Sequence, residues 1–412
     1  MLSSPVFSLR YELVFPALVV SRLLLGLTGV SNALKHDQQL SSPLTSYSHL
    51  QEGIYLFNHD VDPYSGGVFH HSPLLLMLFT TILPTSRLVS EVLWAASDAV
   101  SAWCLVQVWR VRQRVDSSQH DSLVCASYLL NPYILLPSLA LSTSTIDNMF
   151  VLLSLMYACR GKKSASLLSS AILLQLSLPS VILVAPLLML IATDPVSRLA
   201  SPRSFGGNLR TLSALLAEFV VYTVALTAIS SIAAGDFGWV PQTWGVSFTL
   251  PDLTPNPGLW WYFFTEMFDH FRPFFLMVFS VHLLIYVVPI CLKFQYDALY
   301  ASFLLVGVLG TFKAYPTIAD PGLFLSMTAL FPEVYSHLRY PIVTALLHLH
   351  ASLLMPLFYH LWLYQGTGNA NFFYASTLVF ACANGAALMD CIWAGLRIAI
   401  GKEEDRYVVA QE

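Results

Sequence analysis

The sequence predicts an all-α membrane protein, a single polytopic domain over residues 1–412 built as a transmembrane helical bundle of about twelve spans. Composition is the first observation behind this prediction. Of the 412 residues, 56% are hydrophobic and only 11% are charged, against roughly 25% charged residues in an ordinary globular domain. A body of this size has too few polar side chains to cover a water-facing surface, whereas lipid-facing helices need few.

Apolar stretches long enough to cross about 30 Å of hydrocarbon are the second observation. The first follows a start that resembles a signal peptide, but Arg22 interrupts it and no small-residue cleavage site follows, so we expect a retained span. Broken stretches are tolerated at membrane depth only where protein or a watery cavity covers them. The continuous stretches are 13–30, 88–109, 212–234, 274–292, 341–359 and 372–396. The broken pairs are 123–141 with 148–159, 165–178 with 181–191, and 299–312 with 323–337, and the short stretch 74–83 is expected at the interface.

The placement of Lys and Arg is the third observation, because cytosolic loops carry an excess of both. With the N-terminus in the cytosol and about twelve crossings, fifteen of the 20 Lys and Arg residues are cytosolic and four are not, with Arg22 inside the first span. Both termini and a short tail, 397–412, are then cytosolic. The long loops 31–72 and 235–273 are luminal.

Motifs for cofactors and nucleic acid are missing from the sequence. The net charge is −4 with no basic tract, so no nucleic-acid partner is expected. No repeat, Gly-rich phosphate loop or His-x-x-x-His pattern occurs. The six cysteines lie in apolar stretches without a Cys-x-x-Cys pair, which predicts unpaired core thiols.

The first long loop holds an Asp-x-Asp pair, Asp60 and Asp62. Two carboxylates one residue apart can hold a divalent cation or act as acid and base in sugar transfer. The pattern is weak, and an Asp-initiated turn before Pro63 explains it as well. We favour the turn.

The second long loop has a rigid, proline-rich turn around Asp252, Thr254 and Asn256, followed by an aromatic run over 260–271 that we expect to form a helix at the membrane interface. Glu266 and His270 lie four residues apart and can pair with each other on that helix. An aromatic belt is one interpretation of this loop. The other is a surface that grips lipid chains while Asp252, Asn256 and Glu266 meet a polar head.

Near the C-terminus, the segment 360–374 ends one span and begins the next. Asn369 and Asn371 lie at the start of the last long helix, where they either cap it or bind a glycan or phosphate beside the positive helix end. Charged residues also occur inside apolar surroundings, at Lys313, Asp320, Asp98 and Asp147. Unpaired charge is costly there, so we expect Lys313 and Asp320 to pair.

Five phrases together resemble one family: 62–70 (DPYSGGVFH), 130–133 (LNPY), 251–271 (PDLTPNPGLWWYFFTEMFDHF), 312–320 (FKAYPTIAD) and 368–374 (GNANFFY). They are similar to the phosphatidylinositol-glycan class U family, a membrane subunit of the glycosylphosphatidylinositol (GPI) transamidase of the endoplasmic reticulum. The resemblance implies a fold like that of the multi-span, GT-C type glycosyltransferases, used without catalysis and without cofactor or metal. It also implies other transamidase subunits as partners, including a caspase-like cysteine protease that carries the catalysis, together with the GPI lipid and membrane lipids.

The alternative is a dolichol-phosphate-mannose-dependent mannosyltransferase of GPI biosynthesis with the same fold. Those enzymes place an Asp-x-Asp a helical stretch upstream of the Pro-Tyr turn, where positions 44–46 of this chain hold no carboxylate. Asp60 and Asp62 abut the turn itself, which counts against catalysis. The residues expected to bind GPI or lipid are Asn369, Asn371, His360, Trp362, Asp252, Asn256, Trp261, Phe264, Glu266 and His270, with no catalytic residue.

Overall fold

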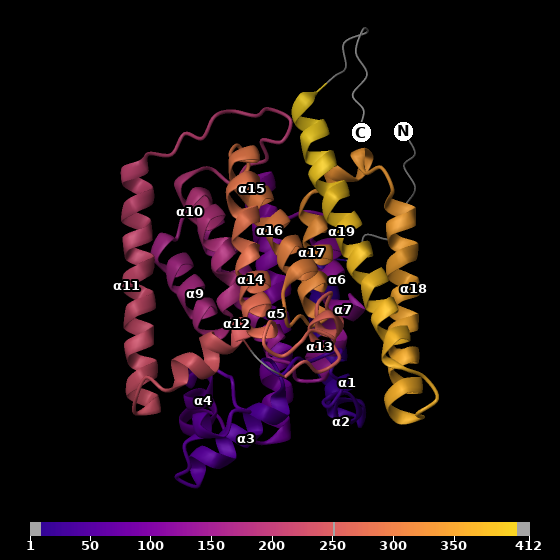
Figure 1. Cartoon of the computed structure of the whole chain (residues 1–412). Coiled ribbons are helices and arrows are strands. Elements are labelled where there is room, and N and C mark those ends of the chain that lie inside the picture. The colour runs from indigo at the N-terminus through magenta and orange to yellow at the C-terminus, as the bar shows by residue number, and fades with distance from the viewer. Residues whose placement is uncertain (1–9, 250–251, 402–412) are drawn as a thin grey trace.

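The computed structural model describes residues 10–249 and 252–401, and every regular element in that part of the chain is a helix (Figure 1). The all-α prediction is therefore confirmed for these residues. The first nine residues and the stretch 402–412 of the expected charged tail lie outside the described residues, as do Leu250 and Pro251.

Within residues 10–249 and 252–401, five helices are long and apolar enough to cross a membrane, and there are six such spans if one bent pair of short helices is taken together. The five match five of the six continuous stretches that the sequence predicts. The remaining stretch forms α1 (Tyr11–Leu27), a helix of 17 residues. The five are α5 (Arg87–Gln113), α11 (Leu209–Ala234), the run of α14 (Arg272–Val281), η5 (His282–Tyr286) and α15 (Val287–Lys293), the run of α18 (Pro341–Tyr359) and η8 (His360–Tyr364), and α19 (Ala370–Ile400).

The chain bends inside the stretch 123–141, which the hydropathy pattern predicts as one segment. Between α6 (Asp121–Leu129) and α7 (Pro132–Leu139) the bend is 50°. Proline lacks a backbone N–H and cannot continue a helix, and the Asn131 side chain caps the new one by accepting from the backbone N–H of Tyr133 at 3.0 Å. The other short helices of the bundle are α8 (Ser144–Cys159), α9 (Lys163–Leu176), η3 (Leu178–Leu183), α10 (Val184–Ala192), α16 (Ala298–Phe312), α17 (Ala319–Met327), η6 (Thr328–Leu330) and η7 (Pro332–His337).

The main core is centred on α16, which is buried along most of its length between α10, α17 and α19. Gly310 permits the close approach of α16 to α17. A Cβ atom there would lie 2.8 Å from the Cα atom of Pro321, so any larger residue would push the two helices apart.

All six cysteines are unpaired, as predicted, and five are buried; Cys382 is exposed, so the expectation of a core thiol is wrong for it.

Short helices gather at one end of the bundle, where Figure 1 shows α3 projecting beyond the long helices. The stretch 74–83 contributes Leu75, Leu76 and Phe79 to a small second core with Trp94 and Trp239. This core fixes the first long loop to α5 and to the start of the second. The elements of this end are α2 (Val30–Leu34), α3 (Tyr47–Asn58), η1 (Pro63–Gly66), α4 (Pro73–Met77), η2 (Leu78–Ile82), η4 (Pro241–Gly245), α12 (Val246–Thr249) and α13 (Trp261–Thr265).

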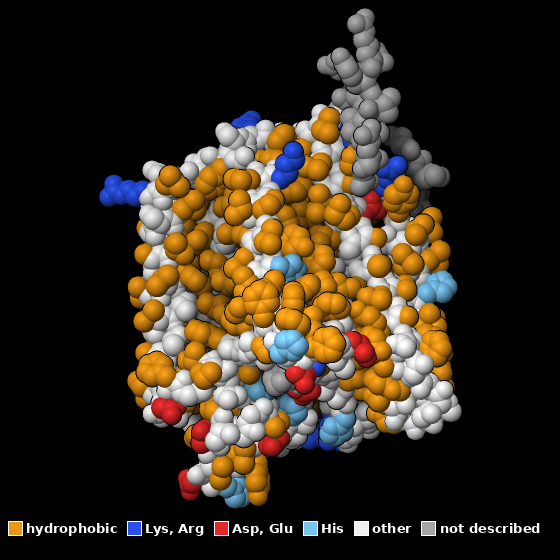
Figure 2. Space-filling model, in the orientation of Figure 1, with side chains coloured by type: hydrophobic (Ala, Val, Ile, Leu, Met, Phe, Trp, Pro, Cys, Tyr) orange, Lys and Arg blue, Asp and Glu red, His pale blue; other side chains and the backbone are white. Residues whose placement is uncertain are grey.

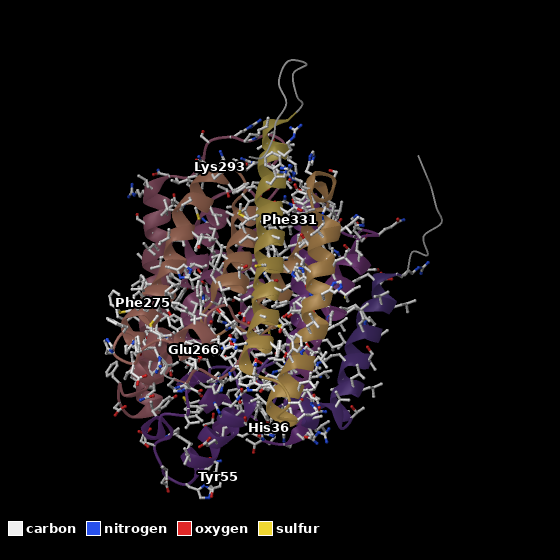
Figure 3. The ribbon with its side chains drawn as sticks, turned by 45° about the vertical axis from the view of Figure 1, so that its right-hand side comes forward. His36, Tyr55, Glu266, Phe275, Lys293 and Phe331 are labelled. Atoms are coloured by element: carbon white, nitrogen blue, oxygen red, sulfur yellow. The ribbon has the colours of Figure 1, made fainter. Side chains whose placement is uncertain are left out.

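The two ends of the bundle carry different charges. Figure 2 shows a wide hydrophobic band, with most of the visible Lys and Arg above it and most of the visible Asp and Glu toward the lower end. Figure 3 places Lys293 near the upper end and His36 and Tyr55 at the lower one. At the upper end the buried Arg112 is held by two carboxylates, those of Asp297 at 3.1 Å and Glu333 at 2.9 Å.

Candidate functional site

Aromatic side chains join the loop 235–273 to the turn between α18 and α19. The Trp261 ring of α13 is 3% exposed and lies 6.2 Å from the Trp362 ring, nearly parallel to it. The rings of Phe373 and Tyr374 at the start of α19 are each 5.8 Å away. The Tyr374 hydroxyl donates to the backbone carbonyl of Leu259 at 3.1 Å. We call this cluster of Trp261, Trp362, Phe373 and Tyr374 the aromatic joint.

Trp261 and Phe264, two of the residues expected to bind lipid, are both buried. The indole Nε1–H of Trp261 is buried and has no hydrogen-bond partner among the described residues, and a buried donor without an acceptor costs free energy. Phe264, also expected at the site, is 1% exposed and packs its ring 5.5 Å from that of Phe279 on α14. Phe264 therefore anchors α13 to α14.

Asn369 begins α19 as its N-cap. Its backbone is extended, with φ −141° and ψ 168°, and its Oδ1 accepts from the backbone N–H groups of Asn371 at 3.0 Å and Phe372 at 3.3 Å. Capping satisfies backbone donors that a helix start otherwise leaves unpaired. The capping interpretation is therefore confirmed for Asn369, whereas the side chain of Asn371 is exposed beside it.

The preceding turn is compact. The backbone N–H groups of Thr367 and Gly368 both donate to the carbonyl of Leu361 at 3.0 Å, and Gly366 has a positive φ of 65°, which glycine adopts without strain. His360 starts the π-helical end of α18, is exposed, and has its Nε2 3.2 Å from Nε2 of Gln365. The turn thus presents imidazole and amide groups outside the aromatic joint.

Asn256 and Asp252 lie apart from the joint's rings. Asn256 is 1% exposed, and its amide serves its own turn: Oδ1 accepts from Gly258 N–H at 2.8 Å, and Nδ2 donates to Thr254 O at 3.1 Å. Asp252 is exposed and lines a cleft with Lys35 and His36 of the first long loop. The amide of Asn256 therefore serves its own turn and is already hydrogen-bonded.

The expected helix over 260–271 is wrong beyond its first turn. The helix α13 ends at Thr265, so Glu266 and His270 do not share a helix face, and both are exposed. The Arg272 guanidinium ends the helical run, because it donates to the backbone carbonyls of Phe264 and Met267 at 2.8 and 2.9 Å. Figure 3 shows Glu266 in the lower half of the molecule.

The Asp-x-Asp pair forms a turn. Oδ1 of Asp62 accepts from the backbone N–H of Tyr64 at 3.0 Å and caps the short helix η1. Asp60 has a positive φ of 58° and is exposed. Across residues 10–249 and 252–401, no group of three or more His, Cys, Asp or Glu side chains is arranged to hold a metal ion. The turn interpretation is therefore the one that the geometry supports.

Several charged residues inside the bundle are paired, and the pair of Lys313 and Asp320 is the predicted one. Lys313 Nζ lies 2.9 Å from Asp320 Oδ1. Arg22 contacts both Asp98, at 3.2 Å, and Glu91, at 3.3 Å. Lys313 also borders a cavity of about 170 Å³, together with Asp147.

Comparison with known proteins places these features in a family. The family model described as "GPI transamidase subunit PIG-U" matches residues 16–380. The chain belongs to the PIG-U family of GPI transamidase subunits. Among its relatives, the GPI transamidase component GAB1 of Saccharomyces cerevisiae is 36% identical over 89% of each chain. The GPI-anchor transamidase component PIGU of Mus musculus is 30% identical over 97% of this chain and 96% of its own length, and the GAB1 homolog of Schizosaccharomyces pombe is 31% identical over 90% of each.

The PIG-U match covers both halves of the aromatic joint, from Trp261 to Tyr374. It supports the transamidase interpretation over the mannosyltransferase one, since the relatives are all named as transamidase components.

Sequence reasoning missed how the joint and the cavity are assembled. Trp261 and Trp362 were both candidates, but nothing in their sequence positions indicated that their rings meet. Asp147 and Lys313 were both noted as charges in apolar surroundings. The sequence holds only a weak signal that Asp147 and Lys313 lie close together. Each lies at a predicted break between helices, and broken segments at membrane depth often line a cavity.

Proposed function

We propose that this chain is a non-catalytic subunit of a GPI transamidase in the endoplasmic reticulum membrane, and that it helps to bind and present the GPI lipid. Its partners are the other subunits of the complex, including a caspase-like catalytic subunit, and membrane lipids. Membership of the PIG-U family supports the assembly. The aromatic joint supports the role in lipid binding, because it places an apolar wall and exposed polar side chains at the same turn.

Within this proposal Asn371 contacts the polar head of the lipid. Its exposed amide offers both donors and acceptors, lies in the first turn of the 31-residue helix α19, and so benefits from the positive helix end that attracts phosphate. Asn369 positions this turn through its cap. Trp261 holds the joint together, and Trp362, which packs against it, supplies apolar surface.

The remaining candidates have smaller roles in the proposal. His360, Glu266 and His270 are exposed and can meet polar parts of the lipid head. Asp252 shares its cleft with the first long loop. Asn256 and Phe264 are buried and hold the loop in shape.

The test compares two variants in the assembled complex, Asn371→Ala and Asn369→Ser. Loss of one neutral hydrogen bond costs about 0.5–1.5 kcal/mol, so Asn371→Ala should weaken GPI retention about two- to twelve-fold while the partner subunits still copurify. Asn369→Ser keeps a capping oxygen and should retain GPI. Loss of the partners with Asn371→Ala, or unchanged GPI retention, would contradict the proposal.

We further propose that the bundle crosses the membrane about twelve times and has the architecture of GT-C type glycosyltransferases. The support is the number of successive helical passes: α1, α5, α6 with α7, α8, α9, η3 with α10, α11, α14 to α15, α16, α17 to η7, α18 and α19. Several are short for about 30 Å of hydrocarbon, since 16 residues extend about 24 Å, and they lie in the core, where neighbouring helices cover their ends.

Both ends of the chain are cytosolic in this proposal, and the loops 31–72 and 235–273 are luminal. The basic upper end of the bundle supports this orientation. Glycosylation acceptor sites placed in loop 235–273 and after residue 401 test it. Modification of the loop alone is expected, and modification of the tail would reverse the orientation.

The proposed absence of catalysis can be tested on the Asp-x-Asp pair. Asp62 caps a turn and Asp60 is exposed, so Asp60→Asn with Asp62→Asn should keep GPI attachment within a few-fold in cells. Complete loss of attachment in an assembled complex would revive the mannosyltransferase alternative.

A further inference from the structure

A second candidate, beyond the aromatic joint, is the cavity of about 170 Å³ beside Lys313. Its volume exceeds that of an engineered apolar cavity of about 150 Å³ that binds benzene, so a segment of a hydrocarbon chain fits. No residue of the aromatic joint lines it. One part of its wall is apolar: Leu176, Leu178, Ile182, Val281, Leu283 and Leu284.

The cavity opens on the outer surface of the bundle. Val281 and Leu284, at the end of α14 and in η5, line the cavity and are also 42% and 50% exposed. They belong to one of the five long apolar helical runs, whose outer surface faces lipid in a membrane. An alkyl chain can therefore pass between the bilayer and the cavity.

The polar part of the wall includes Lys313 and Asp147, whereas Asp320, which pairs with Lys313, does not line the cavity. Lys313 Nζ pairs with Asp320 at 2.9 Å, and the other oxygen of Asp320 accepts from the backbone N–H of Thr317 at 2.8 Å. Asp147 lines the same cavity, and its carboxylate makes no hydrogen bond to any described residue. One ammonium thus faces two carboxylates, and one of the two is unmatched.

We propose that this cavity binds a membrane amphiphile that carries a primary ammonium group, with its alkyl chain along the apolar wall and its ammonium at Asp147. The added positive charge balances the unmatched carboxylate, which is costly in an apolar environment. The hydroxyls of Thr45 and Thr243 and the imidazole of His70, which also line the cavity, can accept the remaining ammonium protons. An anionic head is disfavoured because it would add a third negative charge.

Photoaffinity labelling of the assembled complex tests the proposal. The complex is placed in phosphatidylcholine nanodiscs that contain a long-chain primary amine with a diazirine in its chain. Label is expected in peptides that contain 176–182 and 281–284. An unlabelled amine of equal chain length should compete at least five-fold better than the matching alcohol or fatty acid, and equal competition by the alcohol or the acid would overturn the proposal.

Three variants complete the design. Asp147→Asn should reduce labelling at least five-fold, and Glu52→Gln, which removes an exposed carboxylate of α3 outside the cavity, should not. Leu284→Trp blocks the exposed mouth without changing any charge, so it tests the site even if Asp147→Asn assembles poorly. Full labelling of both cavity variants, or label confined to other peptides, would overturn the proposal. Asn371→Ala should leave labelling unchanged, which separates this site from GPI binding.

Discussion

Two clusters of charged side chains inside the bundle contain the same number of positive and negative groups but have different surroundings. Each combines one cation with two carboxylates: Arg22 with Glu91 and Asp98, and Lys313 with Asp320 and Asp147. In the first, both carboxylates contact the guanidinium, at 3.3 and 3.2 Å, and all three side chains are at most 3% exposed. In the second, one carboxylate is paired and the other lines a cavity.

The difference teaches how to separate structural charge from charge available to a ligand. Ser138 adds to the contacts of the Arg22 cluster, because its hydroxyl donates to Asp98 and its backbone carbonyl accepts from Arg22 Nη2 at 2.8 Å. One oxygen of each carboxylate, Glu91 Oε1 and Asp98 Oδ1, is buried without a hydrogen-bond partner among the described residues. No cavity residue is part of that cluster. The same contrast recurs at the start of α19, where Asn369 is engaged as a cap and Asn371 is exposed. When two residues of the same type are compared, the one whose side chain makes no hydrogen bond within the protein is the candidate for binding a ligand.

Removing Arg22 should have the largest effect. Arg22→Met leaves Glu91 and Asp98 as uncompensated buried charges, which costs about 3–5 kcal/mol, so the complex should lose thermal stability strongly or fail to assemble. The triple variant with Glu91→Gln and Asp98→Asn removes those charges and should recover most of the loss. Thermal unfolding in detergent measures both. If Arg22→Met lowers the free energy of unfolding by less than about 1 kcal/mol, the two carboxylates do not depend on Arg22 for their charge balance.

The next prediction compares the two carboxylates directly. Asp98→Asn weakens hydrogen bonds to a charged partner and should cost about 1.5–3 kcal/mol. Asp147→Asn loses no hydrogen bond and removes an unmatched charge, so stability should stay within about 0.5 kcal/mol or rise slightly. Thermal unfolding of the two variants, side by side with the parent complex, gives both values. Equal losses would remove the distinction between the clusters.

The sequence predicted the fold better than the site. Composition and hydropathy sufficed for the all-helical bundle, because they depend on local chemistry. The bend between α6 and α7 was not predicted, although Asn131-Pro132 is a local signal for it. The end of α13 at Thr265 depends instead on Arg272, whose guanidinium binds two carbonyls. The contact of Trp261 with Trp362, and of Arg22 with Glu91, depends on tertiary packing that periodicity does not encode.

A buried histidine of the first long loop extends the comparison to pH. Burial lowers the pKa of His71 to about 4, although the hydrogen bond from its Nε2 to the Ser46 carbonyl, at 2.9 Å, opposes the shift. The unfolded chain takes up a proton near pH 6.5, so stability is complete above about pH 6.5 and falls toward pH 4.

The expected loss from His71 is about 1.4 kcal/mol at pH 5.5, because the slope approaches 1.36 kcal/mol per pH unit. His71→Gln keeps a donor for Ser46 but does not titrate. The difference in melting temperature between the parent complex and this variant should therefore change between pH 7.5 and 5.5. If that difference in melting temperature is the same at both pH values, the His71 imidazole is not buried in its neutral form.

The smallest effect is expected at the start of α19, where it separates a structural amide from an available one. Asn369→Ala removes the oxygen that accepts from Asn371 N–H and Phe372 N–H, and loss of such a cap costs about 1 kcal/mol. Asn371→Ala removes an exposed side chain and should leave stability unchanged within about 0.5 kcal/mol. Asn369→Asp keeps the capping oxygen and adds a negative charge at the positive helix end, so it should be at least as stable as the parent. Thermal unfolding without added GPI lipid measures all three. If Asn371→Ala destabilises the complex as much as Asn369→Ala, its amide serves the fold or a partner subunit, and a loss of GPI retention in that variant would no longer identify a binding residue.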